Sequence, residues 1–155
     1  MRTINALFEY QLHYILSVES QLIEGLSIMA STTTDRMLNE VLEIQLEKTK
    51  ENKKQLSILV ESCQGDDEVS CMVMNAYLQE VQQLIKLASE EEVLNAGLMT
   101  EAQKIVHFKI SIYSAALYYA NILDYVKMSA SLTDILEREK QDLRTLASLE
   151  KDHME

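Results

Sequence analysis

The sequence predicts an all-α fold, an antiparallel bundle of four long helices plus one shorter helix. The chain has 155 residues, of which none is proline and only three are glycine. Strands need turns that favour these two residues, so their scarcity favours long helices. Apolar residues also recur at steps of three and four along several long stretches, which places them on one stripe of a helix. The length suits a single domain, predicted to span residues 1–155.

The first helix is predicted from about Ile4 to Ala30. Thr3 suits its N-cap, because a threonine hydroxyl can accept a hydrogen bond from an otherwise unpaired backbone N–H. One stripe of this helix holds six apolar residues and one glutamate: Phe8, Leu12, Ile15, Glu19, Leu22, Leu26 and Met29. A carboxylate within a stripe that faces the core needs a partner.

The second helix is predicted from about Asp35 to Cys63, with Thr34 or Thr33 as its cap. The short polar connection before it makes the first two helices antiparallel neighbours. Its stripe contains three consecutive polar layers between apolar ones, formed by Gln45, Thr49 and Asn52. Buried polar groups need partners, so these layers indicate a polar centre in the core.

The third helix is predicted over residues 68–89, after a turn at residues 64–67, and its stripe is apolar throughout. The fourth is predicted over residues 92–125. It is apolar on most sides, which is typical of the most buried helix of a bundle. Lys109 stands in the middle of this apolar run, an unusual place for an ammonium group.

The fifth helix is predicted over residues 132–149, after a last turn of the fourth at residues 128–131. Ser131 and Asp134 resemble a capping box at its start. Its stripe consists of five leucines and one acid: Leu132, Leu136, Glu139, Leu143, Leu146 and Leu149. Glu139 therefore repeats the situation of Glu19 in the first helix.

Composition and charge exclude several classes of function. The net charge of −11 disfavours binding to nucleic acid or to an anionic membrane surface. No stretch approaches the roughly 18 apolar residues of a membrane span, and the first ten residues lack the pattern of a signal peptide. Cys63 and Cys71 are the only cysteines. Free thiols in a cytoplasmic protein are favoured over a disulfide between them.

Two carboxylates in core-facing stripes need a shared cation or hydrogen-bond donors. In ferritin-like bundles, glutamates and Glu-x-x-His pairs on facing helices hold two metal ions. Neither His13 nor His107 has an acid three residues before it. Only Glu150 and His153 have this spacing, and they lie at a terminus that is expected to fray.

Four short motifs carry a resemblance to a known family. They are Glu-Ser-Gln-Leu at residues 19–22, Leu-Glu-Lys-Thr at 46–49, Ala-Gln-Lys-Ile-Val-His-Phe-Lys at 102–109 and Glu-Arg-Glu-Lys at 137–140. In this order and at these distances, the chain resembles the bacterial stress-induced ferritin-like proteins of the YciF/YciE type over about residues 7–149. The resemblance implies a ferritin-like helical fold, a homodimer, a role in stress and a dinuclear metal site.

The chain departs from this family at several positions of the implied metal site. Val106 and Lys109 stand where the family tends to carry glutamates, and Lys48 replaces another. Asn52 stands where the family often has His or Gln. Three candidate ligands match the family: Glu19, His107 and Glu139.

These departures suggest a hypothesis without metal or other cofactor. Lys109 or, as the second choice, Lys48 lies where a metal would lie and forms a buried ion pair with Glu19 and Glu139. The protein is then a non-catalytic, stress-associated homodimer of the cytoplasm that binds neither nucleic acid nor membrane.

The alternative is a ferritin-like di-iron or di-manganese protein with oxidase or peroxide-handling activity. Glu19, His107 and Glu139 would then be the remnant ligands of iron or manganese. Structural explanations stay open as well. Both glutamates could reach water from boundary positions, and His107 could be a neutral core or boundary histidine.

Overall fold

The computed structural model describes the backbone of residues 1–65 and 69–154, and the side chains of these residues up to position 152. Five helices make up this part of the chain, and it contains no strand. Their bounds are α1 Ile4–Thr32, α2 Arg36–Val60, α3 Met72–Leu87, α4 Glu91–Ile122 and α5 Val126–Met154. The prediction of an all-α protein with four long helices and one shorter helix is confirmed.

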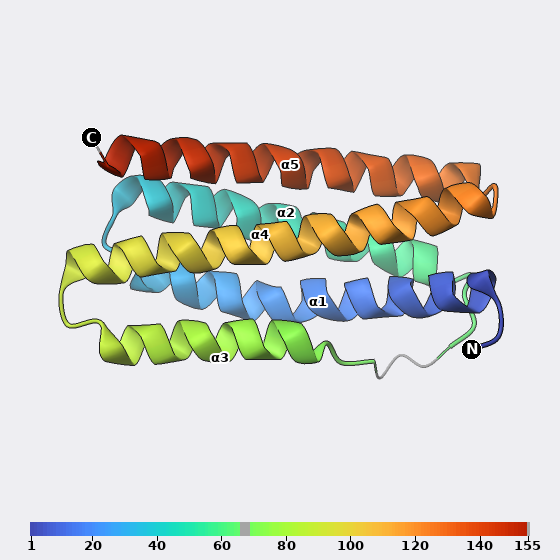
Figure 1. Cartoon of the computed structure of the whole chain (residues 1–155), viewed down its shortest axis with the longest axis horizontal. Helices are drawn as coiled ribbons and strands as arrows, with labels where there is room; N and C mark the ends of the chain where they lie inside the picture. The colour runs from blue at the N-terminus through green and yellow to red at the C-terminus, as the bar shows by residue number, and fades with distance from the viewer. Residues whose placement is uncertain (66–68, 155) are drawn as a thin grey trace.

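Helices α1, α2, α4 and α5 form the bundle, and α3 lies against its side (Figure 1). Each of the four long helices runs antiparallel to its two neighbours, with α1 packed on α2 and α4, and α5 packed on α4 and α2. The shorter α3 packs on α1 and α4. The centre of the four-helix part is therefore enclosed by residues that lie far apart in the sequence.

The core-facing stripes are confirmed. All seven stripe residues of α1, including Glu19, are buried, as are the three polar layers of α2. In α5, five of the six stripe residues are buried and Leu143 is half-buried. The expectation that α4 is the most buried helix of the bundle is wrong. It has 11 buried residues among 32, against 11 among 29 in α1, and Tyr118 and Ile122 are 63% and 50% exposed.

The connection between α1 and α2 differs from its prediction. Thr3 caps α1 as expected, accepting a hydrogen bond from a backbone amide of the first turn at 3.0 Å. The cap of α2 is Asp35, whose carboxylate accepts from Leu38 N at 2.9 Å. Thr33 and Thr34 were predicted to do this, but their hydroxyls pair with Asn95 of α4, at 2.7 and 2.9 Å.

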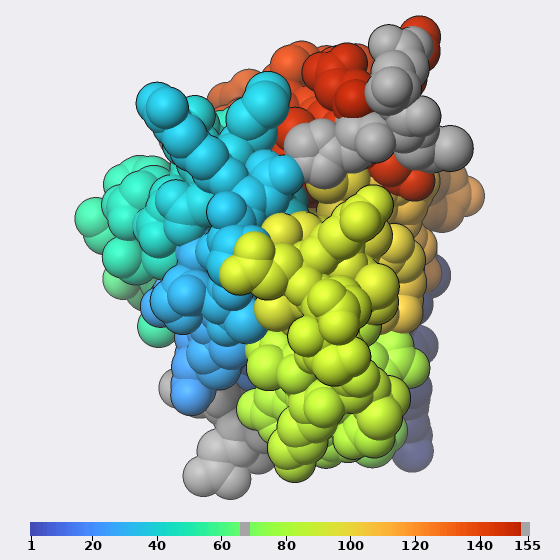
Figure 2. All heavy atoms as spheres, turned by 90° about the vertical axis from the view of Figure 1, so that its left-hand side faces the viewer, coloured from blue at the N-terminus to red at the C-terminus, as the bar shows by residue number. Residues whose placement is uncertain are grey.

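Figure 2 faces this end of the molecule. There the α1–α2 connection, drawn in cyan, lies against the start of α4 in yellow-green, and the end of α5 in red lies above them. The Asn95 contacts with the two threonines join the first two of these segments. Asn95 therefore ties this connection to the start of α4, while Thr33 Oγ1 also accepts a hydrogen bond from Asp35 N at 3.2 Å.

Helix α3 is shorter than the predicted range of residues 68–89. Cys71 caps it, with the sulfur accepting from Met74 N at 3.2 Å. Residue 68, where the helix was predicted to begin, and part of the predicted turn lie in the segment 66–68, which is outside the described residues. Both cysteines are free, as predicted, with Cys71 buried and Cys63 half-buried.

The boundary between α4 and α5 lies earlier than predicted. Helix α4 ends at Ile122, and Asp124 has a φ of 58° in the left-handed region, which aspartate tolerates better than most residues. Helix α5 then begins at Val126. Ser131 lies inside α5, so the predicted capping box with Asp134 is wrong. The chain turns at Asp124, and α5 then continues without a break to Met154.

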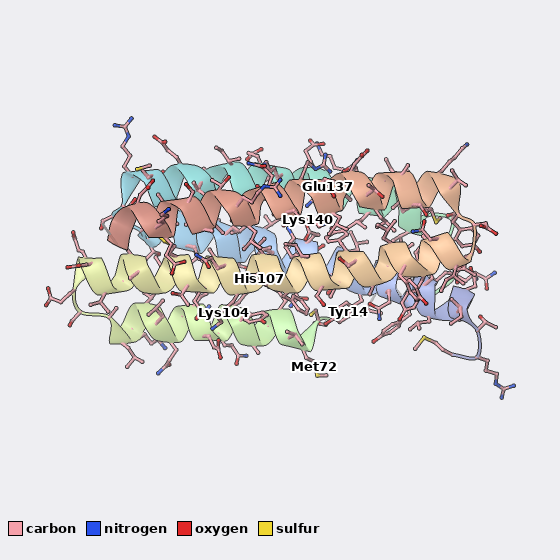
Figure 3. The ribbon with its side chains drawn as sticks, turned by 45° about the horizontal axis from the view of Figure 1, so that its top comes forward. Tyr14, Met72, Lys104, His107, Glu137 and Lys140 are labelled. Atoms are coloured by element: carbon pink, nitrogen blue, oxygen red, sulfur yellow. The ribbon has the colours of Figure 1, made fainter. Side chains whose placement is uncertain are left out.

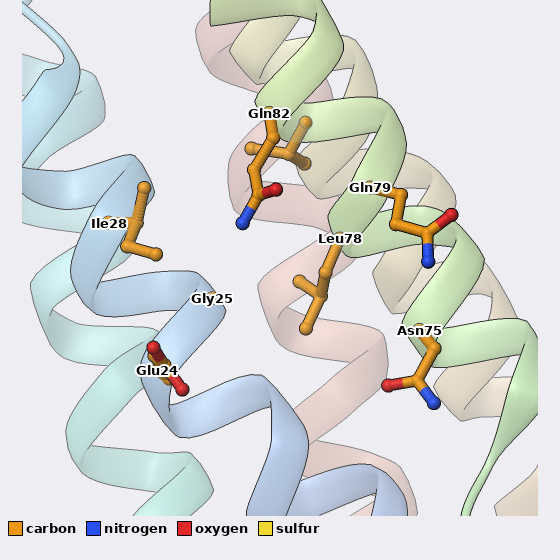
Figure 4. Close-up of a pocket in the computed structure, with 8 residues that line it drawn as sticks. Glu24, Gly25, Ile28, Asn75, Leu78, Gln79 and Gln82 are labelled. Atoms are coloured by element: carbon orange, nitrogen blue, oxygen red, sulfur yellow. The ribbon is translucent and has the colours of Figure 1, made fainter.

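Two glycines allow α3 to approach the bundle closely. A Cβ at Gly25 of α1 would lie 2.3 Å from Leu78 Cδ2, and a Cβ at Gly97 of α4 would lie 2.6 Å from Leu84 Cδ1. Figure 4 shows Leu78 facing the α1 ribbon at Gly25, beside a groove of about 220 Å³ between α1 and α3.

Among the described residues, no helix has both the length and the apolar character that crossing a bilayer requires.

Candidate functional site: a buried ion-pair network

Each of the four long helices contributes one polar side chain to the centre of the bundle. They are Glu19 of α1, Asn52 of α2, Lys109 of α4 and Glu139 of α5, and none is more than 3% exposed. The core-facing stripes explain this placement, because the helical period that buries the neighbouring apolar residues also buries the polar residue among them. Three charged groups are thus held out of water in the core.

Lys109 lies between the two carboxylates. Its Nζ is 3.0 Å from Glu19 Oε1 and 2.6 Å from Glu139 Oε1. Asn52 links the same two acids from another side, since its Nδ2 donates to Glu19 Oε2 and to Glu139 Oε1, at 3.0 Å each. The two acids therefore share an ammonium and an amide, which provide the partners that buried carboxylates need.

Arg138 sets the orientation of the Asn52 amide. Its Nη2 donates to Asn52 Oδ1 at 3.2 Å and also to Gln55 Oε1. With the amide oxygen occupied by the guanidinium, the amide nitrogen faces the acids. Arg138 is half-buried, so it connects the central group to the boundary of the bundle.

Burial and neighbouring charges shift the pKa values of Lys109 and Glu19. Burial disfavours the charged form of Lys109, but the nearby Glu139 and Glu19 outweigh it and raise the lysine pKa above its usual value. Burial raises the pKa of Glu19 to about 7, and the charge of Glu139 adds to this, while Lys109 and Asn52 oppose it. One ammonium serves two acids, so Glu19 retains a proton more readily than an ordinary carboxyl.

Tyr113 lies one helical turn after Lys109 on α4. It is fully buried, and its hydroxyl has no hydrogen-bond partner within the described part of the chain. Burial raises the pKa of Tyr113, and the charges of Glu19 and Glu139 raise it further. The phenol is therefore held in its neutral form.

A second ion pair lies beside the first. Lys48 Nζ is 2.6 Å from Asp142 Oδ1, and Asp142 follows Glu139 by three residues on the same face of α5. Lys48 was a candidate partner of Glu19 and Glu139, and the structure pairs it with Asp142 instead. Sequence reasoning missed Asp142, although its spacing from Glu139 was a signal that could have found it.

His107 does not join this group. It is exposed, whereas Lys109 on the same helix is buried, and Figure 3 labels His107 on α4. Each residue of an α-helix is rotated by about 100° from the one before it. Residues two positions apart, such as His107 and Lys109, therefore point to nearly opposite sides. His107 was a remnant ligand beside the two acids only in the alternative with metal, and its exposed position keeps it apart from them. The side chain of His153, the other candidate from the sequence, lies outside the described residues.

The residues at this position do not fit a pair of divalent cations. Within the described residues, no group of three or more His, Cys, Asp or Glu side chains is arranged to hold a metal ion. One oxygen of Glu19 and one of Glu139 already contact the ammonium of Lys109. A positive side chain there supplies no ligand and repels a cation.

The chain is similar to known proteins along most of its length. The family described as a domain of unknown function, DUF892, matches residues 3–155. Protein YciF of Escherichia coli strain K12 is 30% identical over 142 residues, which cover 90% of this chain and 86% of that protein.

Solved structures agree with this similarity. The crystal structure of the E. coli stress protein YciF matches with a TM-score of 0.94 at 28% identity, covering 99% of this chain and 98% of the other. YcfI of Rhodopseudomonas palustris matches with a TM-score of 0.89 at 24% identity over 94% of each chain. The second likeness bears on the fold alone.

Proposed function

Because this chain belongs to the DUF892 family and is similar to the stress protein YciF along most of its length, we propose that it is a non-catalytic stress-response protein. In this proposal a buried ion pair replaces the dinuclear metal site of the ferritin-like fold. The whole chain acts as a single helical domain. Its role depends on its surface and on the stability of its bundle.

The observation that carries this proposal is the position of Lys109 between Glu19 and Glu139, at 3.0 and 2.6 Å. Tight binding of iron or manganese requires several oxygen or nitrogen ligands, and carboxylates offset the charge of the cation. Here the side-chain ammonium offsets the charge of the carboxylates. The site therefore supports a structural role, in which the acids keep their partner without any metal.

Metal analysis tests the proposal directly. The full chain is purified without chelator, incubated with Fe²⁺ or Mn²⁺, desalted and analysed for metal content by mass spectrometry. We expect no stoichiometric iron or manganese. A content of about two ions per chain, as a dinuclear bundle site requires, would overturn the proposal.

The matched control is the double variant Glu19→Gln/Glu139→Gln. It keeps the size of both side chains and removes both carboxylates. Metal that is bound between the two acids disappears in this variant, whereas metal on the acidic surface remains. The pair of measurements therefore separates a true core site from surface binding on a protein with a net charge of −11.

A second candidate function is a di-iron or di-manganese oxidase or peroxide-handling protein. The convergence of Glu19 and Glu139 on one point in the core favours it, because carboxylates from separate helices hold the metals in ferritin-like proteins. It requires Lys109 to leave this position. The metal analysis decides between the two candidates.

The oligomeric state and the compartment belong to the same proposal. Tyr118 and Ile122, one turn apart on α4, expose apolar surface, which supports a homodimer through this face. The two free cysteines support a cytoplasmic protein. Sedimentation analysis of the wild type and of Tyr118→Ser/Ile122→Ser tests the dimer. A wild-type monomer would contradict it.

A further inference from the structure

A small cavity lies beside the buried ion pair. It has a volume of about 10 Å³, and its polar lining consists of Gln45, Thr49, Lys109, Glu139 and Asp142. The other lining side chains are apolar and come from α1 and α4. A polar cavity of about 10–15 Å³ holds one water molecule, provided that it offers two to four hydrogen-bonding groups. Both the size and the lining meet this condition.

Gln45 supplies an independent observation. It is only 5% exposed, and its Nε2 has no hydrogen-bond partner among the described residues. A buried amide N–H without a partner is costly, and native proteins satisfy such groups almost without exception. Since Gln45 lines the cavity, an acceptor inside the cavity would satisfy it.

We propose that this cavity binds one internal water molecule. The water accepts a hydrogen bond from Gln45 Nε2 and donates its own protons to the carboxylates of Glu139 and Asp142. The choice of water over a monovalent cation follows from two facts. An unpaired N–H requires an acceptor, which a cation is not, and Lys109 already places a positive charge at the cavity wall.

This water would join two ion pairs that otherwise stand side by side. The first is Lys109 with Glu139 in the core, and the second is Lys48 with Asp142. The side chain of Lys48 is 32% exposed, so the joined chain of polar groups runs from the centre of the bundle to solvent. Protons could then exchange between the buried acids and solvent without opening the bundle.

The inference does not rest on the proposed function, because it follows from the cavity and from Gln45. Metal content tests the proposed function, and water occupancy tests the inference. Either can fail while the other holds.

A high-resolution crystal structure of the wild-type chain provides the first test. We expect one density peak in the cavity, at about 2.7–3.2 Å from Gln45 Nε2 and from a carboxylate oxygen. The inference is overturned by an empty cavity. It is also overturned by a peak that only oxygen atoms surround, with the Gln45 amide turned to present Oε1, since this pattern indicates a cation.

Water ¹⁷O relaxation dispersion in solution provides the second test, with Gln45→Met as the variant. Methionine has about the length of glutamine but lacks the N–H donor, so the water loses one of its partners and we expect one fewer long-lived water than in the wild type. The matched control is Gln55→Met, because Gln55 is on the same helix but contacts Arg138. We expect it to keep the wild-type count. Equal counts in both variants would contradict the inference, and the wild-type crystal structure decides it if Gln45→Met does not fold.

Discussion

Lys109 Nζ of α4 lies 2.6 Å from Glu139 Oε1 of α5, and neither side chain is more than 4% exposed. Glu19 of α1 shares the same ammonium at 3.0 Å. A buried pair of this kind contributes little net stability against an apolar core, but removal of one partner leaves a charge without compensation. The consequences for stability and for pH dependence are therefore specific to these residues.

Lys109→Met is expected to lower the free energy of unfolding by about 3–5 kcal/mol, because it leaves two buried carboxylates without their cation. Urea unfolding measures the change. The control is Lys50→Met, since Lys50 pairs with Glu47 at 3.1 Å on the exposed face of α2. Removal of such a surface pair costs less than about 1 kcal/mol. Equal losses in the two variants would show that Lys109 has no special partner.

The pKa of Glu19 predicts the pH dependence of Glu19→Gln. Burial raises this pKa to about 7 from an ordinary value of 4.5. The folded state therefore holds the proton more tightly than the unfolded state, and the contribution of Glu19 to stability falls as the pH rises from about 4.5 to about 7. Gln mimics the neutral acid. The variant should thus gain stability relative to the wild type as the pH rises from about 4.5 to about 7.

Urea unfolding of both proteins across this pH range tests the sign of the effect. Comparison with Glu19→Gln removes the contributions of the other carboxyl groups, which both proteins share. A difference in stability that stays constant with pH, or that changes in favour of the wild type, would show that the pKa of Glu19 is not raised.

Gly97→Ala is expected to destabilise the protein although alanine is the better helix former by about 1 kcal/mol. The new Cβ would lie 2.6 and 2.7 Å from the two methyls of Leu84 and 3.1 Å from its Cγ, so the whole side chain must shift. Such overpacking costs about 1–3 kcal/mol. Thermal unfolding measures the loss, and Leu84→Ala in the same chain should restore part of it.

Gly25→Ala should cost less than Gly97→Ala. Only one methyl of Leu78 lies within 3.0 Å of the new Cβ, and the groove beside it gives the side chain room to move. Thermal unfolding of the two variants side by side tests this order. A larger loss at Gly25 would mean that Leu78 is held more firmly than its surroundings suggest.

Lys48→Met is expected to raise the pKa of Asp142. Burial already raises this pKa, and the hydrogen bond from Lys48 opposes the shift, so loss of the lysine removes the opposing contribution. Carbon-13 NMR titration of the side-chain carboxyl measures the change. Lys50→Met should leave the pKa of Asp142 unaltered. A pKa that does not respond to Lys48→Met would contradict the pairing.

The helices and their buried faces could be predicted from the order of residues alone. The stripes that contain Glu19 and Glu139 follow from the spacing of apolar residues, which is a local property of the α-helix. The resemblance to the YciF/YciE type was also visible in four short motifs. The ends of the helices were predicted less well. Thr33 and Thr34 form hydrogen bonds with Asn95 and do not cap α2, and Asp124 turns the chain before α5.

Which polar groups meet in the core depends on how the helices pack against one another. Lys109 and Lys48 were both candidates for the two glutamates, and the packing of α4 and α5 assigned Lys109 to them and Lys48 to Asp142. The bridge by Asn52 and the cavity beside Gln45 depend on the same packing. Helical period is set by neighbours in the sequence, whereas contacts across the bundle are set by helices that are distant in it.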